Sequence, residues 1–298
     1  MKITISGASG LIGRRLLKTL GAEGHTLHVL SRHAGTNLPG GVRLSPWDPT
    51  RGEPPAESLR DADAVIHLAG EPVAQRWSEE VKRRIRESRV TGTRNLVEAL
   101  KKLSRPPGVL VCASAIGYYG SRGDEILPET ATPGSGFLPE VCVAWETEAR
   151  AAEALGMRVV TMRTGIVLDS RGGALARMLP PFRMGVGGKL GSGKQWMSWI
   201  HWQDLAALYH LALDQPVSGA VNGVAPYPVD NAEFTRTLAG ALHRPAFLPI
   251  PGLALRVLFG EMAEVLLASQ RVAPKAAESA GFPFRFPQLA PALADLLK

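Results

Sequence analysis

The sequence has very few cysteines and no long uncharged apolar run. Its two cysteines, Cys112 and Cys142, are far apart, which excludes a disulfide framework and a paired-cysteine zinc motif. No apolar stretch reaches about 18 residues without a charge, so we expect no membrane-spanning helix. The N-terminus lacks the charged, apolar and small-residue regions of a signal peptide. We therefore expect a cytoplasmic protein without a metal site, in which both cysteines are small buried residues.

Acidic residues are outnumbered by basic ones. The chain of 298 residues has 34 Lys and Arg against 27 Asp and Glu, a formal net charge of +7. Most of the bases are Arg, whose planar guanidinium binds phosphate and carboxylate groups in a bidentate manner. The bases are scattered along the chain and do not form one tract, which argues against nucleic acid. The expected partner is a small substrate, with or without a phosphate or carboxylate group, and the oligomeric state stays open.

The first half of the chain alternates short apolar runs with longer helical patterns, which is typical of βαβ units. Near-continuous apolar strands are buried on both faces, as in a doubly wound sheet. The pattern predicts an α/β protein with a Rossmann-type doubly wound parallel sheet. The expected strands are 3–6, 26–30, 64–68, 109–113 and 159–163, with a short one near 42–44, and the expected helices are 10–20 and 78–103.

The second half is rich in glycine loops with bases and aromatic residues between them. We expect a helix over 204–213 with Asp204 as its N-cap, a strand over 219–224, a helix over 253–269 and a closing helix through Leu297. Residues 1–222 form the expected dinucleotide-binding domain, with substrate loops at 170–202. Residues 245–298 form a small C-terminal helical region that serves as a substrate lid.

A glycine-rich motif follows the first strand and opens the first helix. It has the spacing G-x-x-G-x-x-G at Gly7, Gly10 and Gly13, with Leu11 and Ile12 in its last interval. Glycines there let the backbone approach a pyrophosphate, which then binds the free amides of the helix N-terminus. The motif predicts a dinucleotide cofactor bound by these five residues.

The end of the second strand distinguishes between the two nicotinamide cofactors. An acid there would bind the ribose 2′-hydroxyl, whereas a base accommodates a 2′-phosphate. The strand ends in Ser31 and Arg32, with no acid, and Arg14 and Arg15 follow the last motif glycine. We expect NADP(H) rather than NAD(H), with Ser31 and Arg32 in contact with the cofactor. The alternative is that Arg32 only begins a solvated loop.

Several stretches together resemble extended short-chain dehydrogenase/reductase proteins, over essentially the whole chain. They are 7–13, 63–72, 114–120 and 199–204. The stretches 222–226 and 281–287 resemble most closely the atypical epimerase family, described as NADP-dependent oxidoreductases or sugar-nucleotide epimerases that end in a small domain of unknown function. The resemblance implies further cofactor contacts by Leu68, Ala69, Gly70, Arg84, Arg89 and Val167.

The catalytic pattern of that family is absent. Its members use a Tyr as acid or base, with a Lys four residues later, because hydride transfer at a C–O carbon needs a balancing proton. By the resemblance the pair should fall in 137–148, yet no Tyr lies between Tyr119 and Tyr209 and no Lys between Lys102 and Lys189.

Several other groups are candidates for the missing chemistry. Tyr118 and Tyr119 follow the fifth strand, where ligands bind in such sheets, and Ser114 precedes them. Glu71 is a further candidate base, whereas Glu140 and Glu146 are expected on a helix surface. The alternative for each is a structural role.

The glycine loops carry bases and tryptophans, and this combination suits a flat anionic ligand. The alternative is that the bases are solvated and the tryptophans are core residues. These residues are Arg177, Arg183, Lys189, Lys194, Trp196, Trp199 and Trp202. Two hypotheses for the function follow. One is an NADP(H)-dependent oxidoreductase or nucleotide-sugar epimerase-like enzyme for a small polar or anionic substrate. The other is a non-catalytic NADPH-binding sensor or regulatory scaffold, favoured by the missing Tyr and Lys.

Overall fold

The computed structural model describes residues 1–32, 38 and 40–298, and it is built around one seven-stranded sheet. All strand pairs in this sheet are parallel. Its order is β11 (Gly219–Gly223), β7 (Arg158–Thr164), β5 (Val109–Ala115), β4 (Ala64–His67), β1 (Lys2–Ser6), β2 (Thr26–Ser31) and β3 (Arg43–Pro46). The order reverses between β1 and β4, so the predicted doubly wound fold is confirmed.

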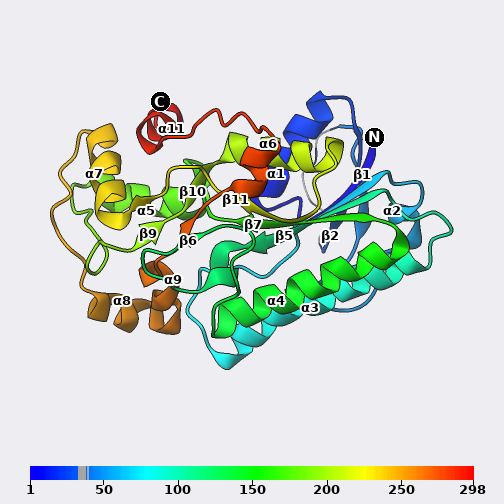
Figure 1. Cartoon of the computed structure of the whole chain (residues 1–298), viewed down its shortest axis with the longest axis horizontal. Coiled ribbons are helices and arrows are strands. Elements are labelled where there is room, and N and C mark those ends of the chain that lie inside the picture. Colours follow the sequence, from blue (N-terminus) through cyan, green and yellow to red (C-terminus); the bar gives the residue numbers. More distant parts are fainter. Residues whose placement is uncertain (33–37, 39) are drawn as a thin grey trace.

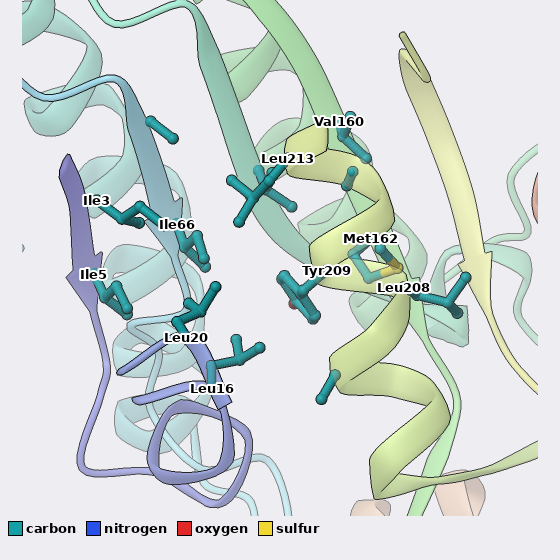
Figure 2. Packing of buried hydrophobic residues seen from close by; sticks show 14 of the residues in the cluster. Ile3, Ile5, Leu16, Leu20, Ile66, Val160, Met162, Leu208, Tyr209 and Leu213 are labelled. Atoms are coloured by element: carbon teal, nitrogen blue, oxygen red, sulfur yellow. The ribbon is translucent and has the colours of Figure 1, made fainter. Parts of the chain in front are cut away.

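Helices cover both faces of the sheet (Figure 1). One face carries α1 (Leu11–Ala22) and α6 (Trp202–Asp214), and the opposite face carries α3 (Glu79–Lys101) and α4 (Phe137–Arg150). The short α2 (Ala56–Leu59) lies in the connection from β3 to β4. Figure 2 shows Leu16 and Leu20 of α1 and Tyr209 of α6 packed against the strands. These side chains are buried because helical spacing places them on one stripe of each helix.

Smaller elements, most of them from the second half of the chain, lie at the carboxyl side of the sheet. Three two-stranded pairs form there: β8 (Ile166–Asp169) with β10 (Trp199–His201), β9 (Trp196–Met197) with β12 (Val229–Asp230), and β6 (Ile126–Leu127) with β13 (Arg271–Val272). The remaining helices are α5 (Gly173–Arg183), α7 (Asn231–Leu242), α8 (Gly252–Phe259), α9 (Ala263–Leu267), α10 (Lys275–Ser279) and α11 (Leu289–Leu296).

The C-terminal segments share their apolar cores with the rest of the molecule. Leu293 of α11 packs in one cluster with Trp199 and with Phe234 of α7. Ala277 of α10 and Phe282 instead join the cluster between the sheet and helices α1 and α6. The boundary at residue 245 therefore stays a prediction from the sequence.

Two expectations for the later helices are wrong. The N-cap of α6 is His201, whose Nδ1 accepts the amide of Gln203, and not Asp204. The carboxylate of Asp204 instead accepts the backbone amides of Arg285 and Phe286. The expected helix over 253–269 is broken, because Gly260 has a φ of +60° and a 3-10 turn separates α8 from α9.

No helix in the described part of the chain has the length and hydropathy needed to cross a membrane. Within the same residues, no three His, Cys, Asp or Glu side chains are grouped so that they could hold a metal ion.

Candidate cofactor site and active site

The glycine motif lies at the switch point of the sheet and requires glycine for steric reasons. Gly7 follows β1 with a φ of +70°, and a Cβ on it would lie 2.6 Å from the carbonyl carbon of Leu68. A Cβ on Gly13 would lie 2.5 Å from the Cα of Ala8. Gly10 is the N-cap of α1 and offers no side-chain acceptor, so the first amides of the helix remain available to a ligand. This loop fits a dinucleotide pyrophosphate.

The end of β4 is fixed beside that loop by a polar contact between neighbouring strands. The Ser6 hydroxyl accepts the backbone amides of Leu68 and Ala69 and lies 2.6 Å from Nδ1 of His67. His67 is fully buried, which lowers its pKa to about 4 and keeps it neutral at pH 7. The loop after β4 is thereby held against the glycine motif.

A cavity of about 570 Å³ opens at this point. It is lined by the glycine loop, the ends of β2 and β4, and the start of α3. The predicted cofactor residues that line it are Gly7, Gly10, Ser31, Arg32, Leu68, Ala69, Gly70 and Arg84. The predicted residues outside its lining are Leu11, Ile12, Gly13, Arg89 and Val167. The cavity thus brings together segments that are distant in sequence.

The connection after β3, which no motif in the sequence singled out, forms another wall of the cavity. Trp47, Thr50 and Arg51 line it, together with Asp48. Partial burial raises the pKa of Asp48, but hydrogen bonds from Thr50 and the charges of Arg51 and Arg32 outweigh burial and lower it. Two guanidinium groups therefore face one carboxylate, which leaves a net positive charge near Ser31. The signal in the sequence that could have indicated this wall was Arg51, a base that follows Pro46 and Pro49.

Arg14 and Arg15 do not reach the cavity. Arg15 forms an ion pair of 2.6 Å with the buried Asp169 and stacks over the Trp202 ring at 4.1 Å. The exposed Arg14 donates to the Ser9 carbonyl at 2.7 Å. Arg15 is thus paired with a buried carboxylate, and neither of these two bases lines the cavity.

Glu71 lies at the rim of the cavity and is engaged on several sides. Its carboxylate accepts from Gln75 at 3.2 Å and lies 3.7 Å from Nε of Arg84. Its backbone amide donates to Ser88, and its carbonyl accepts from Arg89. Arg84 is half exposed and also pairs with Glu80.

Two of the three candidate catalytic residues belong to a buried polar network. Ser114 donates to Glu146 at 2.6 Å, and Arg163 forms a two-point ion pair with the same carboxylate. Arg163 also donates to the Tyr119 hydroxyl, which itself donates to Asn222 at 2.7 Å. The expectation that Glu146 is a surface acid is wrong: it is 7% exposed, because Arg163 on β7 faces it.

This network argues against Tyr119 as a proton donor. Its side chain is fully buried, which raises its pKa to about 12 although Arg163 lies beside it. Ser114 is 4% exposed and its hydroxyl hydrogen is directed at Glu146. Both side chains therefore hold the end of β5 in place.

Tyr118 differs from its neighbour. It is half-buried, its ring lies under the Arg163 guanidinium at 3.5 Å, and no hydrogen bond of its hydroxyl is found within the described residues. Among the three candidates, Tyr118 alone has a hydroxyl that is not already committed to a buried partner.

The bases of the glycine loops are exposed and do not line the cavity. Arg177 donates to the Ala74 carbonyl, while Lys194 and Arg183 extend into solvent. Trp199 is fully buried, and Trp196 stacks under Arg271 at 4.4 Å. Trp199 is therefore a core residue, which was the alternative given for the tryptophans from the sequence.

Comparison with known proteins adds two family matches. Residues 3–225 match the NAD dependent epimerase/dehydratase family, and residues 250–296 match a domain of unknown function, DUF1731.

Proteins similar over their full length come from distant organisms. An epimerase family protein of Mycobacterium bovis is 44% identical over 296 residues, covering 98% of this chain and 96% of that protein. The epimerase family protein YfhF of Bacillus subtilis is 36% identical, covering 100% and 98%. A crystal structure of human epimerase family protein SDR39U1 with NADPH superimposes with a TM-score of 0.88 at 35% identity, covering 99% of both chains. The chain therefore belongs to the NAD dependent epimerase/dehydratase family, as its motifs indicated.

Proposed function

We propose that the protein is an NADP(H)-dependent oxidoreductase or epimerase-like enzyme for a small polar, anionic substrate, located in the cytoplasm. The observation that carries the proposal is the cavity at the switch point, where a glycine cradle and a helix N-terminus face Arg32 and Arg51. The human relative that was crystallised with NADPH supports the cofactor.

Different residues of the chain bind different parts of the cofactor. The amides at the start of α1 bind the pyrophosphate, which Gly7 and Gly13 allow to come close. Arg32 and Arg51 bind the 2′-phosphate, because their two charges exceed that of Asp48. When bound, the cofactor supplies or accepts a hydride, and the chain must then move a proton at the substrate oxygen.

We assign to Tyr118 the transfer of this proton to or from the substrate oxygen. It lies just beyond β5 at the carboxyl edge of the sheet, where ligands of such folds bind. The Arg163 guanidinium over its ring is held in place by Glu146, so the phenol has a fixed orientation. The anionic character of the substrate is inferred from the excess of Arg in the chain.

The cofactor assignment is tested by calorimetric titration of NADPH and NADH. We expect Arg32→Ala and Arg51→Ala each to weaken NADPH binding by about tenfold and to leave NADH binding nearly unchanged, since only NADPH carries the 2′-phosphate. Arg60→Ala, an exposed base outside the cavity lining, is the control. An unaltered preference for NADPH in both variants would refute the assignment.

A second candidate function is an NADPH sensor without catalysis. It is favoured by the buried network that engages Ser114 and Tyr119. The two functions are separated by following NADPH oxidation with a panel of anionic carbonyl compounds, and by following the formation of the epimer with nucleoside-diphosphate sugars, since an epimerase returns the hydride and causes no net oxidation of its cofactor. The enzyme hypothesis expects turnover that falls about 10²- to 10⁴-fold in Tyr118→Phe, whereas the exposed Tyr227→Phe variant behaves as the original chain. Tight NADPH binding without turnover of any compound favours the sensor.

A further inference from the structure

Large apolar side chains are exposed on α8 and on the two stretches of chain next to it. Helix α8 and the connection that leads to it from α7 lie at the end of the molecule away from the N-terminus (Figure 1). Phe247 in that connection is 74% exposed and Leu253 on α8 is 73% exposed, so both side chains project into solvent and do not line a groove. The whole set, which we call the α8 surface, is Met184, Val186, Phe247, Leu248, Leu253, Val257 and Leu258.

Backbone contacts hold the stretches that carry these residues side by side. The amide of Ile250 donates to the Lys189 carbonyl at 2.9 Å, and the amide of Gly191 donates to the Ile250 carbonyl at 2.8 Å. Nε of Arg244 donates to the Arg183 carbonyl at 3.1 Å. Helix α8 begins two residues after Ile250. The apolar residues after α5 and those before and on α8 therefore belong to one part of the surface.

Helix α8 presents an apolar stripe outward. Leu253 and Val257 are four residues apart and so share one side of the helix, with Arg256 beside them. All three are exposed, and the buried residue of the helix is Leu255. A helix that only met water would carry polar residues on that side. Exposed apolar residues that are grouped in this way usually mark a binding surface.

The charges around the α8 surface have one sign. Residues 183–191 and 243–258 contain no Asp or Glu. Among the acids that follow α8, Glu261 pairs with Lys82 at 2.5 Å and Glu264 is exposed. Within the part of the chain that the structure describes, the bases of the two stretches are exposed and form no ion pair. These bases are Arg183, Lys189, Arg244 and Arg256.

This combination of shape and charge favours an anionic bilayer over other occupants. A second copy of the chain would bring the same four bases together across a two-fold axis, where they repel. A partner helix needs a groove, whereas these side chains project. A bilayer accepts projecting apolar side chains at the acyl boundary, and its acidic headgroups attract the bases around them.

We propose that the α8 surface binds the anionic face of a lipid bilayer. The apolar side chains enter the boundary between headgroups and acyl chains, and the four bases lie at the headgroups. The contact is peripheral, because no helix among the described residues can cross a membrane. None of the residues of the α8 surface lines the cofactor cavity, so the inference goes beyond the proposed function and does not depend on it.

Sedimentation with lipid vesicles tests the apolar part of the surface. The probes are vesicles of phosphatidylcholine alone and of phosphatidylcholine mixed with phosphatidylserine. We expect the original chain to bind the mixed vesicles about tenfold or more tightly than the neutral ones, and added salt to weaken the binding. Leu253→Ser and Phe247→Ser should each weaken it about fivefold or more. Tyr227→Ser, which removes an exposed apolar residue outside the α8 surface, is the matched control and should leave it unchanged.

A second pair of variants tests the charges. We expect Arg256→Gln to weaken binding to the mixed vesicles about fivefold and to leave binding to phosphatidylcholine alone unchanged, because only the mixed vesicles carry a net charge. Arg60→Gln, an exposed base outside the two stretches, should have little effect on either. The melting temperature and the affinity for NADPH should stay the same in all these variants, since the exchanged side chains are exposed and lie outside the cavity lining.

Three results would overturn the proposal. One is that the original chain binds neither kind of vesicle. Another is that Leu253→Ser and Tyr227→Ser bind the mixed vesicles equally well, because the attraction would then come from the net charge of the whole chain. The third is a dimer of the original chain in sedimentation velocity that Leu253→Ser dissociates, without vesicle binding, which would show that a second copy covers the surface. Titration with NADPH, performed separately, decides the proposed function in each case.

Discussion

Single residues at the switch point are constrained by backbone contacts more than by side-chain chemistry. Gly7 shows this most clearly, because it combines a left-handed φ with a close approach to the chain after β4. The glycine spacing in the sequence predicted the motif, but it did not reveal that the neighbouring wall is Leu68. That contact exists only because β1 and β4 pair in the sheet.

Gly7→Ala is expected to destabilise the protein by at least about 2 kcal/mol and to abolish NADPH binding, since the added Cβ meets backbone atoms that cannot move independently. The measurement is urea unfolding combined with calorimetric titration. Gly24→Ala is the control: Gly24 has a φ of +80°, but nothing lies within 4 Å of its Cβ position. Equal losses of stability in both variants would show that φ alone, and not the contact with Leu68, makes the glycine necessary.

The candidate catalytic residues could be found from the sequence but not ranked by it. Ser114, Tyr118 and Tyr119 all lie in one short segment at the end of β5 and just beyond it. Their ranking depends on Glu146 and Asn222, which are distant in sequence and complete the buried network. A carboxylate such as Glu146 was expected on the surface because its partner, Arg163, comes from a different element.

At the scale of elements, helices are anchored by contacts that replace the expected caps. Asp204 sits in the first turn of α6, where the sequence pattern suggested an N-cap. Its carboxylate instead accepts two backbone amides of the segment that leads to α11, at 3.0 and 2.9 Å. A local pattern cannot distinguish these two uses of an aspartate, because both are hydrogen bonds to backbone amides.

Asp204→Ala is expected to cost about 2–4 kcal/mol, because the buried amide of Phe286 and the part-buried amide of Arg285 lose their acceptor. Hydrogen exchange should show the amides of Arg285 and Phe286 losing protection before those of the central strands. Asp214→Ala, an exposed acid at the other end of the same helix, should change stability by less than about 0.5 kcal/mol. Unchanged protection at Arg285 and Phe286 would contradict the anchoring role of Asp204.

At the scale of the whole molecule, two buried histidines link stability to pH. His67 and His201 are both fully buried, and burial lowers the pKa of each to about 4. In the unfolded chain they titrate near 6.5. Between these values the unfolded state binds protons that the native state does not, so stability falls as the pH is lowered from 6.5 toward 4.

His67→Gln is therefore expected to reduce the loss of unfolding free energy between pH 7 and pH 5 by about 2 kcal/mol. The variant is less stable at pH 7, since the contact with Ser6 changes, so the informative quantity is the difference between the two pH values. Urea unfolding at both pH values measures it, with His243→Gln at an exposed position as the control. A difference as large as that of the original chain would contradict the assignment to His67.

The sequence by itself determined the fold class, the glycine cradle and the family, because each depends on spacing within one stretch of chain. The relevant patterns are the period of the apolar residues and the order of a strand, a glycine loop and a helix. Tertiary structure decided which cations face the cavity and which side chains remain free for chemistry. Arg51 lines the cavity while Arg15 pairs with Asp169, and Tyr119 is engaged where Tyr118 is not. These outcomes depend on partners that lie tens of residues away and meet only when the sheet forms, so no local pattern contains them.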